Sequence, residues 1–222
     1  MMMTNLSLEH FENGVKLYQD KTLYKFTSDA INLAKFCNIK HSDSVLDMCA
    51  GCGVVGMYAY SITPFSKLYF NDIQKSMCDL VDKNIKLNNM QDVCKVLHKD
   101  LKDLSLDDFG KPLDVIVCNP PYFTGGTPSE DEGVNISTHQ QSCTVEDVAK
   151  CAKLMLKNGG RLWMCYPASG VAEAFAALHN NSMEPKRVQL VYGKKAPYLA
   201  LIEAKKGAKP GLIWEENIIN CE

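Results

Sequence analysis

Short runs of apolar and β-branched residues alternate along the chain with segments whose apolar positions repeat at helical spacing. Within residues 74–87 the apolar side chains share one helical face, and Thr144 is a good N-cap for a second amphipathic segment that should end at residues 158–160. This alternation is typical of parallel strands joined by helices. The strand-like runs occupy residues 44–48, 67–71, 94–97, 113–118 and 161–166.

After the fifth run the pattern changes. Residues 168–180 are helical in character, and two strand-like runs, 187–192 and 198–204, follow Pro185. The five residues between these runs are too few for a parallel crossover and fit a hairpin. The predicted fold class is α/β, with a seven-stranded, mostly parallel sheet and a C-terminal antiparallel hairpin. We expect residues 1–222 to form a single domain in which residues 1–40 are an N-terminal extension and a leading helix.

The composition limits the class of protein without naming a function. Of 222 residues, 46% are hydrophobic and 23% are charged, which is usual for a globular chain. No apolar run approaches the roughly 18 residues that span a bilayer, and the first residues do not resemble a signal peptide. The ten cysteines have irregular spacing, which favours reduced thiols over a disulfide framework. We therefore expect a cytoplasmic protein without a membrane partner, and a monomer is compatible with the sequence.

A glycine-rich loop, DMCAGCGVVG at residues 47–56, joins the first strand to a helix. Gly51, Gly53 and Gly56 spell the GxGxxG of dinucleotide-binding folds, so NAD is a candidate ligand. Asp47, however, stands at the end of the strand. A carboxylate there would bind a cationic group and repel a pyrophosphate.

Two further acids follow the next two strands of the chain. Asp72 is placed to bind ribose hydroxyls, and Asp100 to meet an adenine amine. Each acid alone is as easily a helix cap or a solvated turn residue. Three acids in succession at one sheet edge instead favour a ligand with an ammonium group, a ribose and an adenine, such as S-adenosylmethionine (SAM).

The same loop contains a CxxC pattern, formed by Cys49 and Cys52. Beside a βαβ unit this pattern can be redox-active. The simpler interpretation is that the loop requires small residues, and cysteine is small. A second cysteine pair with metal-binding spacing is absent from the sequence, so we expect no metal site.

The tetrapeptide Asn119-Pro120-Pro121-Tyr122 directly follows the fourth strand. Its prolines fix the backbone and remove two N–H donors, so the Asn119 amide oxygen and the Pro120 carbonyl can both accept hydrogen bonds from one NH₂ group. An aromatic amine is a poor nucleophile because its lone pair is delocalised, and this arrangement would favour the reactive pyramidal form. Tyr122 offers a ring for base stacking, worth roughly 1–3 kcal/mol. The alternative is a tight turn that ends the strand.

Together, DMCAGCG, the strand end at Asp72, His98-Lys99-Asp100 and NPPYF resemble class I, Rossmann-like SAM-dependent methyltransferases of planar amines. The segment LYQDKTLYKFTSDAINLAKF and the tail from LMLKNGGRLWM onward are similar to the tRNA1(Val) adenine N6-methyltransferase-like group. This likeness extends over residues 17–212. It implies SAM as the cofactor, tRNA as the partner and N6-methyladenosine near the anticodon as the product.

The resemblance also implies residue roles. The target amine would be held by the catalytic residues Asn119, Pro120, Pro121 and Tyr122. SAM would be bound by Phe26, Asp29, Asp47, Cys49, Gly51, Gly53, Asp72, Ile73, Asp100, Leu101 and Asn119. Contacts to the substrate would come from Tyr122 and Phe123 and, because of the local excess of basic residues rather than the resemblance, from Lys194 and Lys195. Where the group is expected to have Arg-His-Glu, this chain has Thr138-His139-Gln140.

Other substrates use the same chemistry, among them DNA adenines, rRNA guanines and protein glutamines. Enzymes acting on those substrates carry an additional domain, for which 222 residues leave little room. Between residues 186 and 209, seven basic residues stand against one acid, which favours contact with phosphates or, equally, a solvated hairpin. A non-catalytic SAM-binding or RNA-binding module is the alternative of another class.

Overall fold

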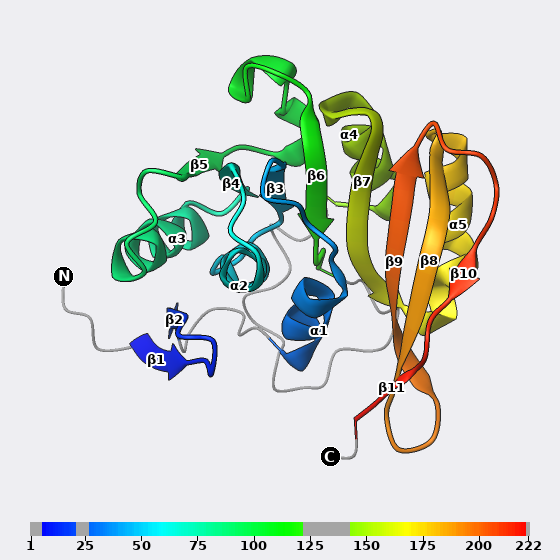
Figure 1. The fold of residues 1–222 in the computed structure, drawn as a ribbon, viewed down its shortest axis with the longest axis horizontal. Coiled ribbons are helices and arrows are strands. Elements are labelled where there is room, and N and C mark those ends of the chain that lie inside the picture. The colour runs from blue at the N-terminus through cyan, green and yellow to red at the C-terminus, as the bar shows by residue number, and fades with distance from the viewer. Residues whose placement is uncertain (1–5, 21–26, 122–142, 221–222) are drawn as a thin grey trace.

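The computed structural model describes residues 6–20, 27–121 and 143–220 (Figure 1). Its centre is a nine-stranded sheet in the order β10-β8-β9-β7-β6-β3-β4-β5, with β11 also paired to β8. The strands β5, β4, β3, β6 and β7 pair in parallel. Their bounds are β3 Ser44–Met48, β4 Lys67–Asp72, β5 Cys94–His98, β6 Leu113–Cys118 and β7 Leu156–Pro167.

The predicted C-terminal hairpin is present. Strands β8 (Met183–Tyr192) and β9 (Pro197–Lys206) pair antiparallel, and β9 lies antiparallel against β7. Two short strands, β10 (Ile213–Trp214) and β11 (Ile218–Ile219), add to β8 in parallel. The α/β fold class is confirmed, and the sequence missed β10 and β11 because two residues leave no alternation to detect.

Helices cover both faces of the sheet, and each face has its own apolar core (Figure 1). Helices α1 (Ser28–Phe36), α2 (Val54–Ile62) and α3 (Lys75–Leu87) pack on one face. Helices α4 (Val145–Met155) and α5 (Val171–Asn180) pack on the other. All five residues of β3 are buried, as expected for a parallel strand with both faces covered. Three short 3₁₀ helices are η1 Leu101–Asp103, η2 Leu106–Asp108 and η3 Ala168–Gly170.

Helix α4 begins as predicted and ends earlier than predicted. The Thr144 hydroxyl accepts a hydrogen bond from the Asp147 N–H at 3.1 Å, and the Asp147 carboxylate accepts one from the Thr144 N–H at 3.0 Å. The predicted stop at residues 158–160 is wrong, because the helix ends at Met155. Leu156, only 1% exposed, already belongs to β7 and pairs with Leu113. Burial of that side chain in the sheet ends the helix before the glycines are reached.

A separate hairpin, β1 (Leu6–His10) with β2 (Lys16–Asp20), precedes the sheet and was not predicted. Two asparagines attach it, Asn84 within α3 and Asn88 directly after that helix. Asn84 Oδ1 accepts from the Tyr18 N–H at 2.7 Å and its Nδ2 donates to the Tyr18 carbonyl at 3.1 Å. Asn88 repeats this pattern with Lys16, at 3.0 and 2.7 Å. The two amides thus satisfy backbone groups of β2 as a neighbouring strand would. In the described ranges, no helix is long and apolar enough to cross a membrane.

Candidate functional site

The carboxyl ends of β3, β4, β5 and β6 meet at one edge of the sheet, because these strands are parallel neighbours (Figure 1). In the register of the sheet, Met48 pairs with both Asn71 and Cys118, and Asp72 pairs with His98. The glycine loop, the acid that ends β4, the segment after β5 and the start of the tetrapeptide therefore lie at adjacent strand ends. In open α/β sheets, ligands bind outside these carboxyl ends.

The glycine loop contains three left-handed backbone positions. The φ angles of Cys49, Gly51 and Gly53 are 58°, 55° and 84°. At Gly51 a Cβ atom would have no described atom within 4 Å, so this side of the loop is open to a ligand. At Gly53 a Cβ atom would lie 3.1 Å from the Phe70 ring, so that glycine serves close packing against β4. The loop therefore uses one glycine for ligand access and another for its own packing.

Asp72 holds the glycine loop in place. Its Oδ2 accepts a hydrogen bond from the Gly51 N–H at 2.9 Å, and its Oδ1 accepts one from the Gln74 N–H at 2.9 Å. Burial raises the pKa of Asp72, and the two backbone N–H groups oppose that rise. Each carboxylate oxygen has further acceptor capacity for a hydroxyl group of a ligand.

Asp47 is buried at the end of β3 and points toward the start of α2. Its Oδ2 accepts from the Gly56 N–H at 2.8 Å, and a Cβ atom at Gly56 would lie 3.0 Å from that oxygen. Its Oδ1 has no hydrogen-bond partner among the described residues, although the residue is only 1% exposed. Burial, with a contribution from the charge of Asp72, raises the pKa of Asp47 to about 8. A buried acceptor of this kind requires a donor, and a cationic donor would restore the ionised carboxylate.

The segment after β5 contributes one polar and one apolar group. Asp100 Oδ1 accepts from the Lys102 N–H at 3.0 Å, and its Oδ2 lies 3.4 Å from the Lys102 ammonium. Asp100 is therefore a cap of η1, whatever else it binds. Leu101 is 7% exposed, whereas Ile73, directly after Asp72, is 43% exposed. Ile73 thus presents an apolar surface at the same edge.

The tetrapeptide begins where β6 ends. Asn119 is half-buried, Pro120 is buried and Pro121 is exposed. Because Cys118 pairs with Met48, Asn119 directly follows a strand end that borders the glycine loop. Some of the predicted positions lie outside the described residues, namely Phe26, Tyr122, Phe123 and the segment 138–140.

Asp29 lies in the first turn of α1 and accepts a hydrogen bond from Tyr198, a residue that the sequence did not single out. Its Oδ1 accepts from the Tyr198 hydroxyl at 2.7 Å, which in turn accepts from the Asn220 amide at 2.9 Å. Burial and the Asp29 carboxylate raise the pKa of Tyr198 to about 12. Lys194 and Lys195 are exposed at the hairpin tip, which lies at the carboxyl edge because β8 is parallel to β7. Tyr198 left no sequence signal because 169 residues separate it from Asp29.

Residues 30–181, more than half of the chain, match the methyltransferase small domain family. The chain belongs to this family. It is 24% identical over 206 residues to the tRNA1(Val) (adenine(37)-N6)-methyltransferase of Flavobacterium psychrophilum, covering 92% of this chain and 84% of that relative. The enzyme of the same name from Flavobacterium johnsoniae is 23% identical over 176 residues, covering 79% of this chain and 74% of that relative.

Solved methyltransferases share the fold. A predicted O-methyltransferase from Agrobacterium tumefaciens superposes with a TM-score of 0.67 at 19% identity, covering 86% of each chain. Trm5 of Methanocaldococcus jannaschii, solved in complex with adenosine, also gives a TM-score of 0.67 at 19% identity, covering 92% of this chain and 57% of that chain. The protein thus has the class I methyltransferase fold, and SAM is its methyl donor.

The geometry at the carboxyl edge of this methyltransferase fits SAM. The open side of Gly51 leaves room for the cofactor beside the Asp72 carboxylate. The unpaired Asp47 Oδ1 can accept from a cationic amine, and the exposed side chain of Ile73 can contact an adenine ring. A pyrophosphate, the defining group of NAD, would lie beside two acids here, Asp72 and the buried Asp47, and neither would stabilise its negative charge. This charge pattern favours SAM.

The two cysteines of the loop are free thiols with raised pKa values. A hydrogen bond with Cys118 and burial raise the pKa of the Cys49 thiol, and burial raises the pKa of Cys52 to about 12. Both thiols are therefore protonated at neutral pH, whereas redox-active cysteines react as thiolates. Within the described part of the chain, no group of His, Cys, Asp and Glu is arranged to hold a metal ion.

Proposed function

We propose that this methyltransferase transfers the methyl group of SAM to the exocyclic N6 amine of an adenine in tRNA, close to the anticodon. The observation that carries the proposal is the position of Asn119 and Pro120, which directly follow β6 at the edge where the glycine loop follows β3. An amine held by these two residues would face a cofactor bound at Gly51 and Asp72.

The chemistry follows from two hydrogen-bond acceptors aimed at one amine. The Asn119 amide oxygen and the Pro120 carbonyl each accept one hydrogen of the NH₂ group and hold both hydrogens out of the ring plane, which favours the pyramidal form with a localised lone pair directed at the methyl group. SAM supplies the electrophilic methyl group. A carbon–nitrogen bond forms as the carbon–sulfur bond breaks, and the alkylated nitrogen then releases a proton to water. Positioning and electrostatic placement supply the rate enhancement, and no strong base is required.

The residues around the cofactor have distinct proposed roles. Asp72 accepts from the ribose hydroxyls, and Asp47 accepts from the cofactor ammonium. Ile73 and Leu101 contact the adenine ring, and Asp100 meets the adenine amine. Cys49, Gly51 and Gly53 let the backbone approach the cofactor, and Phe26 and Asp29 close over it. On the substrate side, Tyr122 and Phe123 stack on the base, while Lys194 and Lys195 contact phosphates.

The choice of tRNA is supported by the relatives. The two Flavobacterium proteins are named for methylation of adenine 37 in tRNA1(Val), and both align with most of this chain. A structural neighbour, aTrm5, was solved with tRNALeu and superposes with a TM-score of 0.65 at 18% identity. The basic hairpin tip, at the same edge as Asn119, agrees with a polyanionic substrate.

The test is methyl transfer from labelled SAM to unmodified bulk tRNA, followed by nucleoside analysis. The expected product is 6-methyladenosine. A different methylated nucleoside would overturn the choice of adenine N6. If tRNA stays unlabelled while calorimetry shows bound SAM, the proposed substrate is wrong, and rRNA, DNA and protein glutamine are assayed next. If no polymer is labelled, the protein is a binding module.

A further inference from the structure

A polar hollow of about 200 Å³ lies at the amino ends of the strands, away from the site described above. It is bordered by the turn before β3 and by the starts of β6 and β7. The strands separate it from the carboxyl edge by their own length, at about 3.3 Å per residue. Its lining residues are Lys40, Asp43, Asp114, Lys157, Gly159, Arg161 and Lys205.

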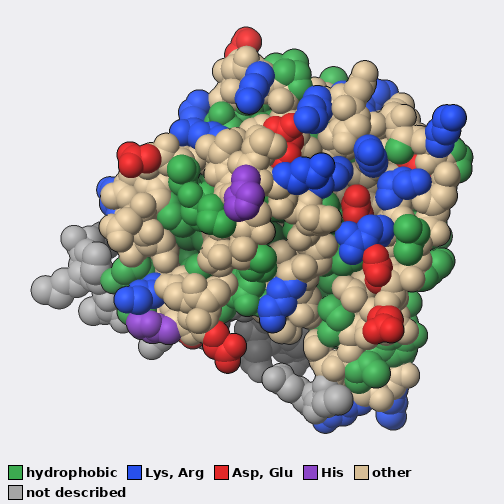
Figure 2. All heavy atoms as spheres, in the orientation of Figure 1, with side chains coloured by type: hydrophobic (Ala, Val, Ile, Leu, Met, Phe, Trp, Pro, Cys, Tyr) green, Lys and Arg blue, Asp and Glu red, His purple; other side chains and the backbone are tan. Residues whose placement is uncertain are grey.

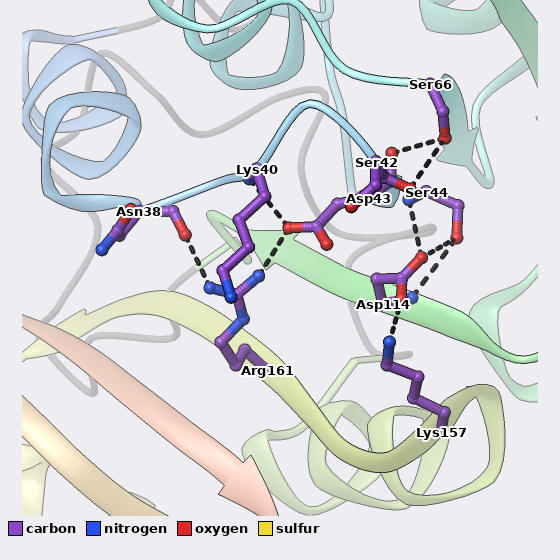
Figure 3. Close-up of polar contacts among 9 residues, drawn as sticks. All are labelled: Asn38, Lys40, Ser42, Asp43, Ser44, Ser66, Asp114, Lys157 and Arg161. Atoms are coloured by element: carbon purple, nitrogen blue, oxygen red, sulfur yellow. Dashed lines mark hydrogen bonds and ion pairs between the residues drawn. The ribbon is translucent and has the colours of Figure 1, made fainter.

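Two ion pairs fix part of this lining (Figure 3). Arg161 donates to Asp43 at 2.5 Å and to the Asn38 carbonyl at 2.7 Å, and its guanidinium lies 4.8 Å from the centre of the Trp163 ring. Lys157 pairs with Asp114. A guanidinium has five N–H donors, and these contacts use two of them. Arg161 is therefore held rigidly with donors still available for a ligand.

Two further cations of the hollow have no carboxylate partner among the described residues. The side chains of Lys40 and Lys205 are exposed, and Lys205 stands directly opposite Arg161 in the antiparallel β7–β9 register. Like charges in that relationship destabilise a sheet. Four cations against two carboxylates leave the hollow with a net charge of +2. An anion would offset this repulsion.

One wall of the hollow also lacks a side chain, at Gly159. A Cβ atom at Gly159 would lie 3.6 Å from Lys205 Cε, so the lysine runs over a position that has no side chain. On this face of the molecule, Lys and Arg side chains gather over β6, β7 and β9 (Figure 2). Lys206, the next residue of β9, points to the opposite face of the sheet and donates to the Leu156 carbonyl, so it is not part of this surface.

We propose that this hollow binds a phosphate group of an RNA backbone, at a point remote from the methylated base. The RNA identity rests on the proposed function, whereas the preference for phosphate rests on the hollow itself. The fixed guanidinium of Arg161 supplies planar donors that match phosphate oxygens. Lys40 and Lys205 supply charge from either side, and the volume admits a phosphodiester with bound water.

The decisive variant is the double substitution Lys40→Ala/Lys205→Ala, which leaves both ion pairs intact. Its matched control is Lys83→Ala/Lys86→Ala, which removes the same charge from the exposed surface of α3. Binding of labelled tRNA is measured by fluorescence anisotropy from 50 to 300 mM salt, because affinity for a polyanion depends on the salt concentration. We expect the hollow variant to bind tRNA about tenfold more weakly near 0.15 M salt. The slope of log binding constant against log salt concentration should become shallower by about one to two.

Two additional measurements separate the possible outcomes. SAM binding by calorimetry should be unchanged in both variants, and inorganic phosphate should raise the melting temperature of the wild type but not of the hollow variant. If only the phosphate effect is lost and the RNA slope matches that of the control, the hollow binds free anions and the proposal is wrong. Equal behaviour of both variants in every assay also overturns it. If the hollow variant shows a shallower salt dependence of RNA binding but the wild type methylates no tRNA, the proposed function is wrong and this inference stands.

Discussion

The Asp72 carboxylate accepts a hydrogen bond from the Gly51 backbone N–H at 2.9 Å, so the end of β4 fixes the loop that follows β3. Gly51 has a left-handed backbone, with a φ of 55°, and one open side. The Asp72 carboxylate satisfies its N–H group in this conformation. One acid thereby holds the glycine loop in shape. In the proposed cofactor site the same carboxylate would also accept from the ribose of SAM, which would couple loop geometry to ligand recognition.

This coupling predicts a double defect for Asp72→Asn. The amide can accept only one of the two backbone hydrogen bonds, and its NH₂ group would oppose the other N–H donor. We expect SAM affinity to fall at least about tenfold and the free energy of unfolding to fall by about 1–3 kcal/mol. Calorimetry and urea unfolding measure these effects. Asp79→Asn, at an exposed acid of α3 paired with Lys75, should change neither.

Asn119→Ala should separate cofactor binding from transfer. The substitution removes one of two proposed acceptors for the target amine and leaves Asp72 and the glycine loop untouched. We expect SAM affinity to change less than about threefold, while single-turnover methyl transfer falls about 10²–10³-fold. Equal loss of SAM binding and transfer would contradict the proposed role of Asn119 in holding the target amine and leave it only its expected role in binding SAM.

The raised pKa of Asp47 predicts that the stability of the cofactor-free protein depends on pH. The pKa of its carboxyl is about 8 in the folded state and about 4 in the unfolded chain. Below about pH 4 both states hold the proton; between about pH 4 and about 8 only the folded state does. Stability should therefore fall as pH rises through this window, by at most about 1.4 kcal/mol per unit.

Asp47→Asn is the matched variant for that measurement. Its amide oxygen can still accept from the Gly56 N–H, but it does not titrate. Urea unfolding from pH 5 to pH 8 should show a flatter profile than that of the wild type. SAM affinity should fall, because the ammonium group loses a carboxylate partner. An identical pH profile in both proteins would mean that Asp47 stays ionised in the folded state.

The N-terminal hairpin should detach when Asn84 is replaced by alanine. Asn84 is fully buried, and its amide also donates to the Cys52 carbonyl at 2.9 Å, so one side chain joins β2, α3 and the glycine loop. We expect the free energy of unfolding to fall by about 2–4 kcal/mol and the Tyr18 amide to exchange faster with solvent. Asn88→Ala, at a half-buried position, should have a smaller effect on both readouts.

Tyr198→Phe tests the contact that joins the hairpin to Asp29. The variant keeps the ring and removes the hydroxyl that contacts both Asp29 and Asn220. Because Tyr198 is 41% exposed, we expect a stability loss of only about 0.5–1 kcal/mol. If Asp29 closes over SAM, KM for SAM should rise severalfold with kcat unchanged. Unchanged KM would confine this contact to a structural role.

Much of the fold could be predicted because its determinants are local. The apolar runs of β3 and β6 and the Thr144 cap of α4 are readable within a few residues, and the structure has them at the predicted positions. The β8–β9 hairpin could be predicted because the connection between the two strands is too short for a crossover between parallel strands. Boundaries that depend on packing could not be predicted. Helix α4 ends before Leu156 because that side chain is buried in the sheet core, and not at the glycines further along the chain.

The sequence by itself determined that three acids and Asn119 would follow strand ends, because chain order and parallel pairing place those ends at one edge. Only the tertiary structure decided what each side chain meets. Asp72 holds Gly51 and Asp47 turns to Gly56, while Arg161 crosses to Asp43, 118 residues away. These contacts depend on which residues the fold brings together and buries, and such proximity produces no pattern in the sequence. The charged hollow at the opposite end of the strands was invisible to the sequence for the same reason.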